Sequence, residues 1–274
     1  MAVSSGARIA TNINALNSYN ALNSISKKIG TVALRLSTGI RLNQAGDDPA
    51  SFTIARKMQA KSRSIAQAIN NVGDAKSVLS IAEGGLMNVS EILLTIKEKI
   101  SQATNGTFGT EELQAVVTQV NDYLAEIGDI VNQTKFSDQK LLSNNFTAKA
   151  FQIGPDAGDI ITVSITQGLS STDLGLNGIT TSNVTTFIAS VDTAINLVSS
   201  QIQYIGSLSN RLDFKETMLG ISQTNVEAAI SRMYDADLAK EQMEMMKLQI
   251  LQNTATAQLA QANAAPQQYL QLFQ

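Results

Sequence analysis

Residues 9–36 read IATNINALNSYNALNSISKKIGTVALRL, and the apolar side chains of this stretch return almost always after three or four positions. That period places them on one face of an α-helix. The apolar positions are Ile9, Ile13, Leu16, Leu22, Ile25, Ile29, Val32 and Leu36. Asn, Ser and Lys occupy the other face, and Ser37, Thr38 and Gly39 are typical of a helix end. The stretch therefore predicts one amphipathic helix with a coiled-coil seam.

A second and longer helix is predicted after it. Asp47 and Asp48 suit the first turn of a helix, and Pro49 is tolerated at the first helical position. The same rhythm then runs to Ile100, so that about 54 residues of helix would extend about 80 Å. The Thr, Asn and Gly residues of 104–109 break this helix.

A third helix is predicted from Leu113 to Val131. The connection before it is short, which favours an antiparallel hairpin of the second and third helices. From about residue 145 to 183 the pattern changes to alternation, with Ile160–Ile165 following a turn at Gly154–Gly158. Alternation after such a turn indicates a small β-hairpin.

Helical periodicity returns for more than 40 residues from Ile188 to Met233. This fourth helix is expected to pair with the second one. A last, weakly amphipathic stretch runs from Leu238 to Ala262 and mirrors the first helix, and Pro266 is expected to precede a short tail.

The predicted fold class is mainly α: a long antiparallel helical rod and a terminal coiled coil, with a small central β-hairpin region. A lone amphipathic helix leaves its apolar stripe in water, so the two end helices are expected to cover each other. The seam is predicted at Ile13, Leu16, Ile25, Ile29, Leu36, Leu248, Leu251 and Leu259. Because neither end has enough core alone, we expect both to be disordered in the free monomer and ordered by neighbouring copies.

Composition argues against catalysis. The chain has no Cys and no His, which removes thiolate ligands, the commonest metal ligand and the usual general base. We therefore expect no catalytic residue, no metal site, no cofactor and no enzymatic activity.

The net charge is -3 without a long basic run, so nucleic acid is not an expected partner. The N-terminus lacks a signal-peptide stretch, and no window is expected to approach a membrane span, so membrane insertion is not expected.

Two stretches carry a specific resemblance to a known family. Residues 34–50 read LRLSTGIRLNQAGDDPA, and residues 231–241 read SRMYDADLAKE. They resemble the N-terminal and C-terminal signatures of bacterial flagellins. Shorter agreements occur at residues 11–16, 82–86 and 132–136, so the resemblance covers both ends and most of the chain.

The resemblance implies a structural subunit that polymerises into the bacterial flagellar filament for swimming motility. It also implies export through the flagellar type III apparatus, with an export chaperone, a filament cap and junction proteins as partners. The implied segments are an inner coiled-coil helix and spoke at 1–44, rod helices and hairpin at 45–187, a rod helix at 188–234 and a second inner helix at 235–274. The chain looks like a short flagellin without large outer domains.

Within the signatures, Arg35, Arg41, Asn43, Asp47 and Asp48 are candidates for contacts between subunits or for fixing the spoke between rod and inner coil. Helix caps and solvated charges are the simpler explanation of acidic residues before a proline.

Met243, Met245 and Met246 are candidates for docking the export chaperone, since Met side chains adapt to varied partners. Packing in the core is the alternative and the simpler explanation.

Flagellins sensed by the flagellin-recognising Toll-like receptor carry an Arg and, one turn later, a Leu in the second helix, and a Glu in the third. The corresponding positions here are Thr95, Lys99 and Gln119. The resemblance therefore implies that this innate immune receptor is activated only weakly.

Two other functions fit parts of the pattern. A hook–filament junction protein shares terminal helices with flagellin but is usually larger in the middle. A coiled-coil adaptor would form closed oligomers, whereas a flagellin forms open helical polymers. The filament is expected to be secreted and extracellular, and a periplasmic or sheathed filament stays open.

Overall fold

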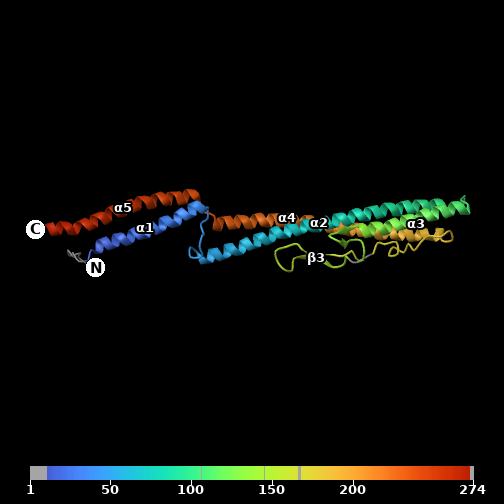
Figure 1. Ribbon diagram of the computed structural model, residues 1–274, viewed down its shortest axis with the longest axis horizontal. Helices are drawn as coiled ribbons and strands as arrows, with labels where there is room; N and C mark the ends of the chain where they lie inside the picture. Colours follow the sequence, from blue (N-terminus) through green and yellow to red (C-terminus); the bar gives the residue numbers. More distant parts are fainter. Residues whose placement is uncertain (1–10, 106, 145, 166–167, 272–274) are drawn as a thin grey trace. The chain divides into compact units, whose positions relative to one another are not determined.

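Helices dominate the computed structural model, which describes residues 11–105, 107–144, 146–165 and 168–271 (Figure 1). The helices in this part of the chain are α1 (Ile13–Thr38), α2 (Pro49–Ala103), α3 (Thr110–Gln133), α4 (Val184–Tyr234) and α5 (Leu238–Gln271). They confirm the mainly α fold class. The chain forms two units: a terminal unit of residues 1–60 and 226–274, and a central unit of residues 61–225.

The terminal unit contains the antiparallel pair of α1 and α5. Arg35 on α1 and Glu244 on α5 are half-buried outside a heptad that the other buried and half-buried residues of each helix follow. On α1 they are Ala15, Ser18, Leu22, Ile25, Ile29, Val32 and Leu36. On α5 they are Glu241, Met245, Leu248, Gln252, Ala255, Leu259, Ala262 and Pro266. Alternating steps of three and four are the pattern of a coiled-coil seam, and small or polar residues hold several of its positions.

Three residues predicted for the seam lie outside this heptad. The exposed fractions of Ile13, Leu16 and Leu251 are 49%, 55% and 41%. Leu251 precedes the seam position Gln252, and one residue turns a helix by about 100°. Ile25, Ile29, Leu36 and Leu259 are half-buried, and Leu248 is buried. The predicted helical residue Ile9 lies outside the described residues.

The end of α5 differs from the prediction. The helix passes through Pro266 and continues to Gln271, whereas a tail was expected there. A proline within a helix removes one backbone hydrogen bond and crowds the carbonyl four residues earlier. That carbonyl belongs to Ala262, and its partner is described with the site below.

The core of the central unit is built on α2. Twelve of its buried residues repeat in alternating steps of three and four. They are Ile65, Ala68, Val72, Ala75, Leu79, Ala82, Leu86, Val89, Leu93, Ile96, Ile100 and Ala103. Two groups of ion pairs join α2 to α4: Lys76 contacts Asp213 at 2.6 Å and Glu216 at 2.9 Å, and Lys97 contacts Asp192 at 2.7 Å. Figure 1 shows α3 turning back along α2, as its short connection predicted.

Two small antiparallel hairpins complete the central unit. β3 (Lys149–Gln152) pairs with β4 (Ile160–Val163), with Lys149 opposite Val163, and this is the predicted hairpin. β1 (Lys135–Phe136) and β2 (Gln139–Lys140) form a second hairpin that the alternation did not predict, because each strand has only two residues.

One helix, α2, includes an 18-residue window that is long and apolar enough to cross a membrane by length and composition. The prediction that no window approaches a span is wrong on these two criteria. Within the structure 39% of that window is buried, and α2 supplies the core of the central unit. A core helix passes the same test, so the window is weak support for membrane insertion.

Candidate assembly surface in the terminal unit

The segments that leave α1 and α4 are hydrogen-bonded to each other. Gly39 ends α1 in the left-handed conformation with φ 68°, and its N–H donates to the Arg35 carbonyl at 2.8 Å. Ile40 and Asp235 then form an antiparallel bridge. The Arg41 N–H donates to the Tyr234 carbonyl at 2.8 Å, and the Ala236 N–H donates to the Gly39 carbonyl at 2.9 Å. The two connections are thereby held as one short β-ladder.

Side chains reinforce this ladder. Arg41 Nη2 donates to the Met233 carbonyl at 2.7 Å. Asn43 Nδ2 donates to Thr38 Oγ1 and to the Ile40 carbonyl, both at 3.0 Å. Both predicted residues therefore hold the connection within one chain, and a contact with another copy stays a prediction.

Asp48 and Asp237 cap the helices that follow the two connections. Asp48 Oδ1 accepts from the Ser51 N–H at 3.1 Å, at the start of α2. Asp237 Oδ1 accepts from the Ala239 N–H at 3.0 Å, at the start of α5. Hydrogen bonds from Ser51 lower the pKa of Asp48, and Arg41 adds a smaller effect of the same sign. The simpler explanation of Asp48 thus accounts for its contacts. Asp237 was missed, although an Asp before an apolar run is the same signal.

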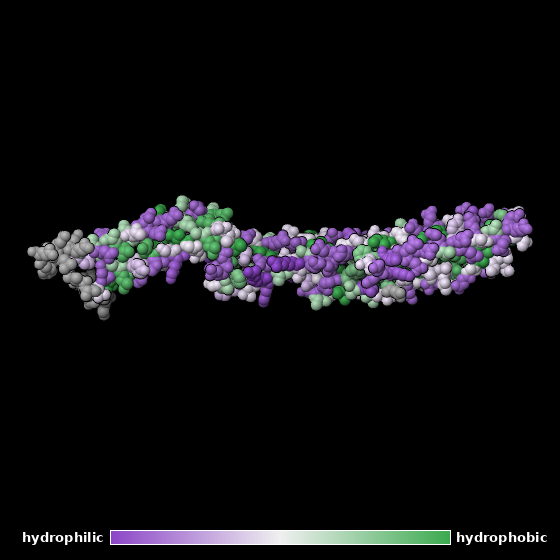
Figure 2. Space-filling view, in the orientation of Figure 1, coloured by the Kyte–Doolittle hydropathy of each residue, from purple (hydrophilic) through white to green (hydrophobic). Residues whose placement is uncertain are grey.

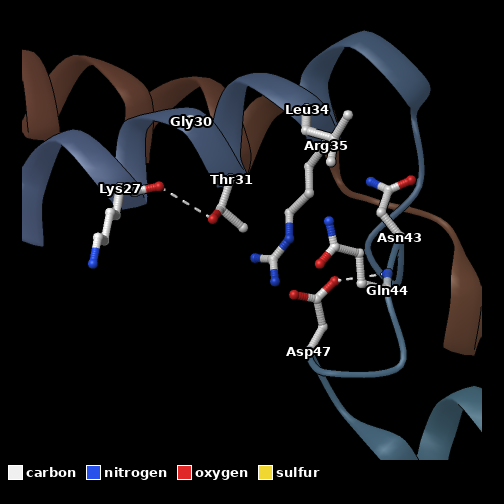
Figure 3. Close-up of a pocket in the computed structure, with 8 residues that line it drawn as sticks. All are labelled: Lys27, Gly30, Thr31, Leu34, Arg35, Asn43, Gln44 and Asp47. Atoms are coloured by element: carbon white, nitrogen blue, oxygen red, sulfur yellow. Dashed lines mark hydrogen bonds between the residues drawn. The ribbon is translucent and has the colours of Figure 1, made fainter.

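Arg35 lies beside an open groove of about 270 Å³. Five residues of α1 from Lys27 to Arg35 line it, together with Asn43, Gln44 and Asp47. Figure 3 shows Arg35, Gln44 and Asp47 pointing toward the same space. Asp47 Oδ2 accepts from the Gln44 N–H at 3.2 Å, which fixes the turn locally.

The contact of Arg35 across the helix pair is with Glu241, at 3.5 Å. The side chain of Glu241 is 14% exposed, and that of Arg35 26%. Among the described residues the buried Nε of Arg35 has no hydrogen-bond partner. Glu241 was quoted in the C-terminal signature but not singled out as a partner for Arg35, because spacing along the chain says nothing of a contact between its ends.

Asn12 makes a further polar contact between the start of α1 and α5. Its Oδ1 accepts from the Ala15 N–H at 3.0 Å, which caps α1, and its Nδ2 donates to the Ala262 carbonyl at 2.7 Å. This carbonyl is the one that Pro266 leaves without a helical donor. Asn12 was not predicted as a site residue.

Large apolar side chains remain exposed on the other faces of both helices. Figure 2 shows apolar surface gathered over the α1–α5 pair, while the central unit presents mostly hydrophilic surface on this face. On α1 these side chains are Ile13, Leu16, Tyr19 and Leu34, and on α5 they are Leu238, Met243, Met246, Ile250 and Leu251. Clustered apolar surface of this kind is typical of interaction sites.

The three methionines predicted for chaperone docking divide between two faces. Met245 is half-buried on the seam toward α1, which is the packing alternative. Met243 and Met246 are 61% and 49% exposed. With Ile250, 67% exposed, they follow steps of three and four along one exposed stripe.

The predicted receptor positions lie in the central unit. Thr95 and Lys99 are half-buried on α2, and Gln119 is exposed on α3. The Thr95 hydroxyl donates to the Glu91 carbonyl at 3.0 Å within its own helix. Weak activation of the receptor stays a prediction.

Among the described residues no group of three Asp or Glu side chains is placed to hold a metal ion. The polar side chains described above cap helices or join the connections, and none pairs a nucleophile with a base. The arrangement is suited to holding helices together and presenting apolar surface.

Comparisons with known proteins agree with this arrangement. The bacterial flagellin N-terminal helical region matches residues 9–147, and the bacterial flagellin C-terminal helical region matches residues 188–273. A flagellin from Halalkalibacterium halodurans is 35% identical over 96% of this chain and 98% of its own length. A flagellin from Bacillus subtilis is 34% identical over 97% of this chain and 99% of its own length.

A solved structure points the same way. The crystal structure of Bacillus cereus flagellin is 25% identical and aligns with a TM-score of 0.50 over 59% of this chain and 94% of its own. Both family regions match, and about a third of the residues are identical to those of two flagellins over nearly the whole chain. These findings agree on one family. The chain belongs to the bacterial flagellin family and is a structural subunit of the flagellar filament.

Proposed function

We propose that this subunit polymerises by packing its α1–α5 pair against the pairs of neighbouring copies. The observation that carries the proposal is the small core of the pair. Among the described residues, α1 buries Val32, and α5 buries Leu248 and Ala255. The central unit, in contrast, buries thirteen apolar residues of α2 alone.

Free-energy considerations favour burial of the apolar surface of the α1–α5 pair by other copies. Burying a large aliphatic side chain contributes about 1.5–3 kcal/mol, so three buried residues do little to offset the entropy of ordering two helices. The exposed stripe at Met243, Met246 and Ile250 offers further apolar area on α5 alone. Neighbouring copies that cover it would stabilise the pair on assembly, and the free monomer would keep its ends disordered.

The same weak core suits export before folding. We propose passage through the flagellar type III apparatus and polymerisation beneath a filament cap, in a filament joined by junction proteins and lying outside the cell. The segments 1–44 and 235–274 would form the inner coiled coil, and 45–187 and 188–234 the surrounding part of the filament.

Partners at three further surfaces are proposed as well. An export chaperone would bind Met243 and Met246 together with Met245, which is free of α1 as long as the ends are unfolded. Arg35 and Asp47 would add polar contacts between subunits through their groove. Receptor activation would be weak, since Thr95, Lys99 and Gln119 replace the contact residues of stimulatory flagellins.

Ile250→Lys tests the assembly surface. The purified full chain is added to filament fragments, and the monomer left at equilibrium is measured while electron microscopy records filaments. Loss of one buried aliphatic side chain is expected to raise this critical concentration roughly tenfold or more.

Gln249→Lys is the matched control, because Gln249 is the exposed neighbour on the same helix and the added charge is the same. It is expected to polymerise nearly as the unchanged chain does. Equal critical concentrations for the two variants would contradict the proposed surface, and small closed oligomers from the unchanged chain would contradict polymerisation itself.

A further inference from the structure

We propose that Asn12 is a positioning residue that sets the register of α1 against α5, by capping α1 and by supplying the donor that Pro266 takes away from α5. This proposal deepens the proposed function and rests on it, since the register decides which faces the pair presents to neighbouring copies.

The chemistry of the Asn12 amide allows both contacts in one orientation only. The Ala15 N–H is a donor, so the atom that caps α1 at 3.0 Å has to be the carbonyl oxygen Oδ1. The Ala262 carbonyl is an acceptor, so the atom 2.7 Å from it has to be the amide nitrogen Nδ2. The cap thereby fixes the amide so that its donor points at α5.

The acceptor on α5 is unlike the other carbonyls in the body of that helix. Each of those carbonyls accepts from the N–H four residues later. Pro266 has no N–H, and it is the proline that lies inside α5. The Ala262 carbonyl is therefore left without its helical donor, and the residue Ala262 is half-buried on the seam toward α1.

The apolar seam alone specifies the register weakly. Its α5 positions include Gln252, Ala255 and Ala262, so a slide by one heptad would lose little apolar contact. Such a slide would leave the Ala262 carbonyl with no donor, and an unpaired polar group at a packed surface is costly. At the other end of the pair, Arg35 and Glu241 add a second tie in the same register.

Four full-length chains test the proposal: the unchanged chain, Asn12→Asp, Pro266→Ala, and the double variant. Asp keeps an oxygen to cap α1 but has no amide donor. Ala at 266 restores the helical N–H, so the Ala262 carbonyl no longer needs Asn12. Asn12→Ser keeps a capping oxygen without adding a charge, and its single short hydroxyl lacks the separate amide nitrogen that reaches Ala262. Asn14→Asp adds the same charge as Asn12→Asp at an exposed position of α1.

The readout is the critical concentration on filament fragments. Asn12→Asp is expected to raise it about fivefold in the chain with Pro266, the effect of about one net hydrogen bond, and less than twofold in the chain with Ala at 266. Asn12→Ser should raise the critical concentration by the same factors in the two backgrounds. Asn14→Asp should not change it in either background. An equal rise in both backgrounds, or no rise in either, overturns the proposal.

Failure of the unchanged chain to polymerise would refute the proposed function instead. Hydrogen exchange in residues 11–20 and 255–271 of the same four chains then decides on Asn12 alone. Loss of protection that depends on Pro266 supports the role of Asn12, and additive losses, or equal exchange in all four chains, overturn it.

Discussion

Gly84 and Gly85 stand side by side on α2, yet the structure predicts opposite effects for their replacement by Ala. A Cβ atom built at Gly84 meets no atom within 4 Å. At Gly85 it lies 2.7 Å from Thr134 Oγ1 and 2.8 Å from Leu142 Cδ1. Neither neighbour moves freely, because the Thr134 hydroxyl donates to the Ile130 carbonyl at 2.7 Å and Leu142 is fully buried.

Each replacement gains about 1 kcal/mol of helix propensity, since Gly is that much less favourable than Ala within a helix. Gly84→Ala is expected to keep this gain. At Gly85 the extra methyl group also costs about 1–3 kcal/mol of overpacking, so its net effect is about 0–2 kcal/mol of destabilisation. The two variants should therefore differ by about 1–3 kcal/mol.

Thermal unfolding of the full-length monomer, followed by circular dichroism, measures the difference. For a unit of this size 1 kcal/mol shifts the melting temperature by about 2–4 °C. Gly84→Ala should melt above the unchanged chain and Gly85→Ala below Gly84→Ala by several degrees. Equal melting temperatures, or a higher one for Gly85→Ala, would refute the close packing of α2 against Thr134 and Leu142.

Three further predictions concern other parts of the chain. The two acidic partners of Lys76 raise its pKa, so its stabilising effect is present below pH 10.5 and lost as the pH rises through the raised value. In urea unfolding experiments from pH 8 to 11.5, the free energy of unfolding should therefore fall less in Lys76→Met than in the unchanged chain. Leu248→Ala, a change of a buried seam residue, should cost about 2–5 kcal/mol in the filament and lower its melting temperature, while the unfolding of the central unit in the monomer stays the same. The chain should stimulate receptor reporter cells weakly, and Thr95→Arg with Lys99→Leu and Gln119→Glu should raise the response; a strong response from the unchanged chain would contradict the assignment of these positions.

The helices were predictable because their apolar residues repeat over many turns. α2 begins at the predicted Pro49, and α1 ends at Thr38 beside the predicted Gly39. The alanines of the α2 core were not predicted, since the pattern was followed through large apolar residues. Ala68, Ala75 and Ala82 nevertheless hold core positions of the same heptad.

The terminal seam was harder to predict, for a physical reason. Apolar residues of α1 and α5 lie on both the paired and the exposed faces, so periodicity could not tell which face meets the partner helix. Leu251 was chosen for its hydrophobicity, whereas the seam position is Gln252. Where neighbouring copies cover the exposed face, as proposed, hydrophobicity marks two kinds of contact, and only the register of the pair separates them.

That register depends on polar atoms that no periodic pattern reports. Pro266 would ordinarily be read as the end of a helix, because it removes a hydrogen bond that the helix needs. Here α5 continues, and Asn12, about 250 residues earlier in the chain, supplies the missing donor. The missing hydrogen bond is thus replaced by one between α1 and α5 rather than within α5, and only where α1 lies in the observed register. A feature that weakens α5 alone therefore favours one arrangement of α1 and α5, as expected of ends that order together on assembly.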